Sequence, residues 1–225
     1  LKPLAEKYYG AIKGGDVIVR NRPKEPPSQA DRRVILKNER VTQPSISRVY
    51  IAPSYHDNHG QARMPYALQV LENILSGSST SRLYQSLVVN QSLAVSTGME
   101  YSPSALDISE ITFWIAPREG ISIDEAEQAL INEINLLVEK GVSQDEVERA
   151  KKSLSEQAIF ARDQLGTASQ VIGTSLSVGL TLDDVEQWPD MISSVTVSDV
   201  NQAIQSVFKN KHTVTGILLT EDNPS

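Results

Sequence analysis

Residues 78–102, SSTSRLYQSLVVNQSLAVSTGMEYS, carry the most informative pattern in this sequence. The serines and threonine that open the stretch predict a turn, the residues to about 91 predict an amphipathic helix, and the β-branched residues after them predict a strand. Such an element could carry a substrate site. Its chemistry is unexpected, however, because aliphatic Val88 and Val95 occupy positions where charged or phenolic groups would be useful.

The segments around this stretch complete the fold prediction. Runs rich in β-branched residues and bounded by turn residues predict strands over about 32–38, 47–53, 93–102, 106–116 and 212–220. Apolar residues at helical spacing predict helices over about 63–77, 80–91, 182–193 and 198–208, and others that begin at the capping-box patterns Ser122–Glu125, Ser143–Glu146 and Thr167–Gln170. Since the strands do not alternate one for one with the helices, we expect an α+β domain with a mostly antiparallel sheet and helices packed on one face.

Two local details add to this prediction. Gly77 ends the helix over 63–77, and we expect it to adopt a positive φ there. In the strand over 106–116, the apolar alternation changes phase between Ile108 and Ile111, which predicts a β-bulge near Ser109 or Glu110.

Composition limits the classes of function. The 225-residue chain has a net charge of -7, which argues against nucleic-acid binding. It contains no cysteine, which excludes disulfides and thiolate metal sites. The longest apolar runs, such as residues 111–116, fall far short of the roughly 18 residues of a membrane span. The compartment is left open, with the periplasm favoured over the cytoplasm.

Motifs for self-sufficient catalysis are absent from the sequence. His56 and His59 form an H-x-x-H pair, but the polar residues between them favour a loop over a metal-binding helix, and no third ligand is evident. His212 precedes the last strand, where we expect it to be exposed. No zinc-peptidase helix motif, nucleophile elbow or phosphate-binding loop occurs, so the sequence assigns this chain no catalytic residue and no metal ligand.

Several motifs together resemble the pitrilysin-type zinc metallopeptidases, or inverzincins, which include mitochondrial processing peptidase and bacterial zinc protease subunits. The later half of these proteins carries a glycine-rich turn followed by S-x-R-L-[FY], which matches Gly77, Ser81, Arg82, Leu83 and Tyr84. The segments 141–151 and 193–208 resemble the start of that half's long helix and its late helix. The resemblance implies that residues 1–10 are the tail of a preceding domain, 11–30 an interdomain linker, and 31–225 the C-terminal half without the zinc motif.

The resemblance also gives a meaning to the two valines. The later half usually supplies an Arg and, seven residues on, a Tyr that stabilise negative charge near the scissile carbonyl; the alignment puts Val88 and Val95 at these positions. For Arg82 and Tyr84 we expect structural roles, a salt bridge or cap for Arg82 and ring packing for Tyr84. We therefore expect this chain alone to hydrolyse nothing.

Two interpretations of the whole protein remain open. In the first, it is the zinc-bearing subunit of a heterodimeric peptidase: zinc is bound in the preceding half, and a second family subunit supplies the Arg/Tyr pair. In the second, it is a non-catalytic scaffold or assembly subunit that lacks both motifs. Either way, the expected partners are the chain's own N-terminal half and a second subunit, with a peptide substrate in the full assembly if it is active.

Overall fold

The computed structural model describes residues 1–15, 28–56, 60, 62–162 and 166–221. Within these residues one sheet has the strand order β1-β5-β2-β4-β3. The strands are β1 Arg32–Lys37, β2 Ser45–Ala52, β3 Ala94–Tyr101, β4 Ser109–Pro117 and β5 Val214–Leu219. Strand β1 pairs with β5 in parallel, and the other neighbours are antiparallel. The predicted mostly antiparallel α+β architecture is therefore confirmed.

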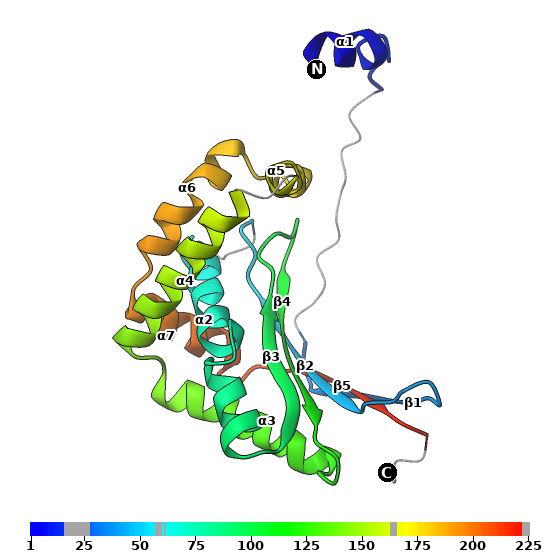
Figure 1. Ribbon diagram of the computed structural model, residues 1–225, viewed down its shortest axis with the longest axis vertical. Helices are drawn as coiled ribbons and strands as arrows, with labels where there is room; N and C mark the ends of the chain where they lie inside the picture. Colours follow the sequence, from blue (N-terminus) through cyan, green and yellow to red (C-terminus); the bar gives the residue numbers. More distant parts are fainter. Residues whose placement is uncertain (16–27, 57–59, 61, 163–165, 222–225) are drawn as a thin grey trace.

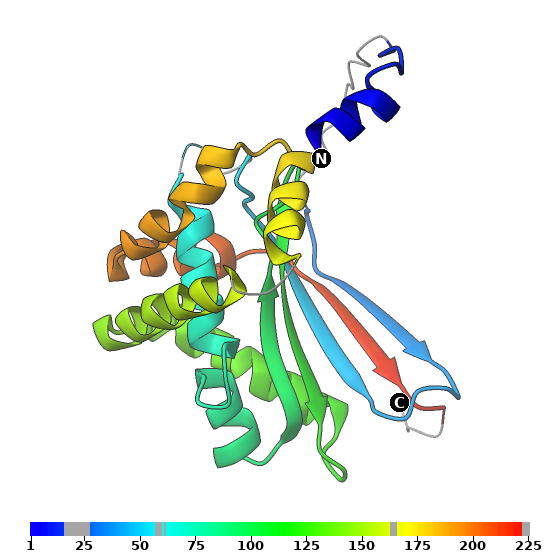
Figure 2. The same cartoon turned by 45° about the horizontal axis from the view of Figure 1, so that its top comes forward.

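The helices that pack on the sheet lie on one of its faces (Figures 1 and 2). The helical elements are α1 Lys2–Tyr9, α2 Met64–Ser76, η1 Tyr84–Asn90, α3 Ile123–Lys140, α4 Gln144–Arg162, α5 Thr167–Ser177, α6 Leu182–Ser193 and α7 Val197–Phe208. Among the described residues, no helix combines the length and the apolar composition needed to cross a membrane.

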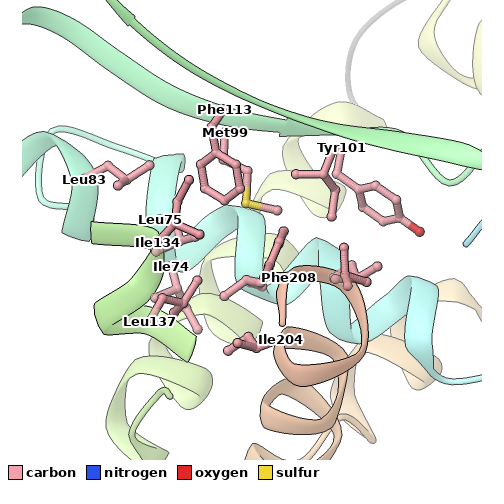
Figure 3. Packing of buried hydrophobic residues seen from close by; sticks show 14 of the residues in the cluster. Ile74, Leu75, Leu83, Met99, Tyr101, Phe113, Ile134, Leu137, Ile204 and Phe208 are labelled. Carbon is pink, nitrogen blue, oxygen red and sulfur yellow. The ribbon is translucent and has the colours of Figure 1, made fainter. Parts of the chain in front are cut away.

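The core lies between the sheet and α2, α3 and α7. Side chains alternate between the two faces of a strand, and the face toward the helices carries fully buried residues such as Met99 and Phe113. Figure 3 shows these two side chains pointing toward Ile74 and Leu75 of α2 and Phe208 of α7. The aliphatic composition and the strand periodicity thus act together to build a single core.

Helix α2 also protects the outer edge of β3. The carboxylate of Glu72 accepts a hydrogen bond of 3.3 Å from the backbone N–H of Tyr101, which faces away from β4. Burial raises the pKa of Glu72 to about 7, and the negative charge of Glu100 adds to this rise. A half-buried carboxyl group therefore covers the strand edge at which another chain could otherwise pair.

The helix starts agree only in part with the capping predictions. Ser143 and Glu146 form the expected reciprocal pair, and the hydroxyl of Ser122 accepts from the N–H of Glu125. The prediction at Thr167 was wrong: α5 has Gly166 as its N-cap, and no side chain caps it. Two further capping boxes, Thr181–Asp184 and Thr196–Asp199, begin α6 and α7.

Two other predictions need correction. The bulge lies in β3, between Ala94 and Ser96, and not near Ser109 or Glu110, because β4 begins only at Ser109 and the earlier apolar residues lie outside the strand. Gly77 has a φ of -69° rather than a positive φ. A Cβ there would lie 2.7 Å from the side-chain nitrogen of Asn73, so the glycine serves a close approach and not a left-handed turn.

Candidate functional site

The turn that precedes η1 is held by its own hydroxyl groups. The Ser81 hydroxyl, which is buried, donates to the carbonyl of Ser78 at 2.6 Å. The Ser78 hydroxyl in turn accepts from the backbone N–H of Thr80 at 3.2 Å. These contacts order the backbone between Gly77 and Arg82, so the serine of the S-x-R-L-Y motif acts on the turn and not on a ligand.

Arg82 connects this turn to the junction between α3 and α4. Its guanidinium donates to one carboxylate oxygen of Glu146 at 2.6 and 3.1 Å and to the carbonyl of Gly141 at 3.1 Å. Burial alone would raise the pKa of Glu146, but hydrogen bonds from Ser143 and Arg82 outweigh it and lower that pKa. Arg82 thus forms a charge-assisted structural clamp on the start of α4.

The segment after Arg82 is helical, as predicted, but it is wound as a π-helix. The N–H of Gln91 donates to the carbonyl of Ser86, five residues earlier, at 2.9 Å. Leu83 and Leu87 are buried on its inner side, and Tyr84 is half-buried. The apolar periodicity fixes which side faces the core, but it does not distinguish an α-turn from a π-turn.

Val88 and Val95 occur on this π-helix and on the strand that follows it. Val88 is half-buried and packs against the hydrophobic core. Val95 is 47% exposed and lies in the bulge at the start of β3. An isopropyl group has no hydrogen-bond donor, so neither residue can stabilise negative charge at a substrate carbonyl.

A carboxylate lies against this part of η1, and its negative charge is wrong for the stabilisation of an oxyanion. The Glu133 carboxylate of α3 accepts hydrogen bonds from Ser86 at 2.5 Å and from Gln91 at 3.2 Å. A carboxylate would repel a developing oxyanion. The sequence pattern did not single out Glu133, because only the packing of α3 against η1 brings it there.

The histidines are not gathered into a metal site in the described part of the chain. His56 is exposed, with its ring 3.5 Å from the Cβ position of Gly179, and His59 lies outside the described residues. His212 is exposed, with its ring 3.8 Å from the carboxylate of Asp31. Among the described residues no group of three or more His, Asp or Glu side chains could hold a metal ion.

A second candidate surface is the sheet face that no described helix covers, here named the bare sheet face. Strand register puts Val34 and Leu36 of β1, Val49 and Ile51 of β2, Trp114 of β4, and Val214 and Leu218 of β5 on it. Val34 and Ile51 are 60% and 57% exposed. The same register puts Arg32, Ser45, Ser47, Glu110 and Thr112 among them. Exposed apolar residues that are rimmed by polar ones mark interaction surfaces in many proteins.

The family described as the peptidase M16 inactive domain matches residues 1–154, more than half of the chain. This chain belongs to that family. The resemblance inferred from the turn and helix motifs is therefore confirmed.

Individual relatives agree with this assignment. An uncharacterized zinc protease of Rickettsia bellii is 27% identical over 149 residues, which is 66% of this chain and 35% of that protein. A protease from Helicobacter pylori has a similar fold, with a TM-score of 0.84, 19% identity, and coverage of 96% of this chain and 51% of that one. An inactive peptidase domain from Bordetella parapertussis gives a TM-score of 0.70 at 19% identity, covering 84% of this chain and 97% of that one.

The matches cover different shares of the relatives' own length. The chain spans about a third of the Rickettsia protein and about half of the Helicobacter protein. The Bordetella structure, by contrast, is an inactive domain of nearly the same extent. The fold of this M16 inactive domain therefore also occurs as one part of longer chains.

Proposed function

We propose that this M16 inactive domain is the non-catalytic half of a zinc-dependent peptidase subunit. It associates with a zinc-bearing half and with a second family subunit, and it closes a chamber around a peptide. The observation that carries the proposal is the bare sheet face. An inactive domain with a complete core and an exposed apolar sheet face is suited to docking on another domain.

The energetics of this face support a docking role. Each half-exposed aliphatic side chain that becomes buried would contribute about 1 kcal/mol. Val34, Leu36, Ile51 and Val214 all belong to this class, each at least 40% exposed. Helix α1 adds to the argument, because it has no buried residue although it carries Leu4, Tyr8 and Tyr9. Contact with a preceding domain would bury the apolar side chains of both surfaces and so stabilise the assembly.

Val88 and Val95 are the reason for assigning the catalytic groups to other parts of the assembly. A half that lacks donors at these positions cannot complete an active site by itself. We propose that the preceding half binds zinc and that a second subunit supplies the cationic and phenolic groups. Zinc bound by the full-length protein, and peptide hydrolysis that requires the second subunit, would support this arrangement. A full-length protein that binds no zinc would instead be the scaffold.

Docking can be tested by expressing the 225-residue chain and the preceding half as separate polypeptides in one cell and purifying them through a tag on the latter. The wild-type chain should co-purify, and Ile51→Asp should reduce its recovery at least tenfold. Ile159→Asp is the matched control, because Ile159 is 62% exposed but lies on α4, away from the sheet. Equal recovery of Ile51→Asp and wild type would contradict the proposed role of the face.

A further inference from the structure

A cavity of the domain lies away from the two valines, neither of which lines it. It has a volume of about 690 Å³ and is bounded by α2, α4, α5, α6 and the loop after β3. Figure 1 shows α5 and α6 beside the same end of α4. A cavity of this size matches those that bind small ligands or single peptide side chains.

The floor of the cavity is aromatic and fixed by hydrogen bonds. The amide of Gln69 in α2 donates to the hydroxyl of Tyr55 at 2.9 Å, and its oxygen accepts from the indole N–H of Trp188 at 2.9 Å. The ring of Tyr66 lies 5.2 Å from that of Tyr55. These contacts hold an aromatic surface in place before any ligand binds.

Tyr66 is unusual among these residues. The residue is 9% exposed, and its hydroxyl, which makes no hydrogen bond to another described residue, is open to solvent. Burial raises its pKa, so the hydroxyl keeps its proton at neutral pH. The hydroxyl is therefore available to donate a hydrogen bond to a ligand in the cavity.

The charged side chains at the cavity are acidic. Asp184 and Glu186 are exposed at its rim, and hydrogen bonds from Thr181 lower the pKa of Asp184, which keeps it ionised. Pro189 within α6 has no N–H, so the carbonyl of Val185, which also lines the cavity, lacks its usual helical donor. No Lys, Arg or His is among the residues described as lining the cavity.

We propose that this cavity binds a peptide segment in which a bulky aliphatic side chain is followed by a basic residue. The aliphatic group enters the aromatic floor, a peptide carbonyl accepts from the Tyr66 hydroxyl, and the cation lies at Asp184 and Glu186. The choice of a peptide rests on the proposed function, and the cavity would then be a second contact for the extended substrate. The cavity itself does not depend on docking of the sheet face.

The indole groups give a direct readout. The chain has two tryptophans, Trp188 in the cavity and Trp114 on the bare sheet face, and their side-chain N–H signals can be followed separately by NMR of the ¹⁵N-labelled 225-residue chain. The probe is acetyl-alanyl-leucyl-arginyl-alanine amide. Saturable movement of the Trp188 signal with a static Trp114 signal is the expected result.

Sequence variants of the probe and the protein test each part of the proposal. Replacement of leucine by alanine, or of arginine by glutamate, should weaken binding at least threefold. Ala158→Phe should fill the cavity and abolish binding. Tyr66→Phe and Glu186→Lys should each lower the affinity about threefold to tenfold, as loss of a hydrogen bond or reversal of a surface charge predicts.

Glu139→Lys makes the same charge change at an exposed position at the end of α3 and should leave affinity unchanged. A Trp188 signal that stays static at millimolar probe would overturn the proposal. So would equal binding of the alanine or glutamate peptide, or an equal response to 3-methylbutylamine, which would assign the cavity to small amines. Because the measurement uses the 225-residue chain alone, failure of sheet-face docking would not change it.

Discussion

Gly141 lies at the junction between α3 and α4, where its carbonyl accepts from Arg82, and one added methyl group should destabilise this junction in two ways. The residue has a φ of +66° and a ψ of -151°, a region that is essentially restricted to glycine, so an alanine there costs about 1–3 kcal/mol in backbone strain alone. A Cβ would also lie 2.3 Å from the side-chain oxygen of Asn201. That oxygen accepts from the buried N–H of Val142 at 2.9 Å, and its displacement costs about 1–2 kcal/mol more.

We therefore expect Gly141→Ala to lower the free energy of unfolding by about 2–5 kcal/mol, which corresponds to a drop in melting temperature of roughly 5–20 °C for a domain of this size. Urea unfolding followed by circular dichroism measures the first quantity, and a thermal scan the second. The matched control is Gly120→Ala, because Gly120 has a φ of +84° but open space around its Cβ position. This variant should lose only about 1 kcal/mol of unfolding free energy, because backbone strain is its only cost.

A double-mutant cycle with Asn201→Ala isolates the steric part. Once the amide oxygen is gone, the alanine at 141 should cost only its backbone strain, so the two substitutions together should cost less than the sum of their separate costs. Equal losses for Gly141→Ala and Gly120→Ala in the wild-type background would refute the argument that Asn201 leaves no room for a side chain.

Two further stability predictions concern charged groups. Arg82→Met keeps the aliphatic stem but removes the guanidinium, so we expect it to lower the free energy of unfolding in urea by about 2 kcal/mol. A double-mutant cycle with Glu146→Gln that shows no coupling would contradict the clamp. Because the pKa of Glu72 is raised to about 7, the folded state binds more protons than the unfolded state between about pH 4.5 and 7, and stability falls as pH rises through that window. Glu72→Gln should therefore match wild type near pH 5 and exceed it by about 1–2 kcal/mol near pH 8, whereas an equal difference at both pH values would be contrary to the assigned pKa.

The sequence predicts the elements of this fold well because most of them are defined by local periodicity. The alternation in β4 and the helical spacing in α3 each identify a buried face without knowledge of the partner. Capping was harder to predict. The pattern sought was Ser or Thr followed three residues later by Glu or Gln, so it missed the boxes at Thr181 and Thr196, where aspartate accepts from the same backbone N–H.

The features that sequence reasoning missed depend on contacts between distant segments. Asn201 comes close to Gly141 only because α7 packs against α3. Glu133 approaches Ser86 across 47 residues of sequence. The π-helical winding of η1 likewise depends on the order of backbone hydrogen bonds, which the apolar pattern does not report.

Whether this chain is catalytically inert is the central claim, and one measurement addresses it directly. The purified 225-residue chain is incubated with a quenched fluorescent peptide that contains leucyl-arginine, with and without added zinc. Because Val88 and Val95 offer no donor, and no described group of His, Asp or Glu can hold a metal, we expect no hydrolysis above the buffer rate. Hydrolysis that a chelator abolishes and zinc restores would contradict the account.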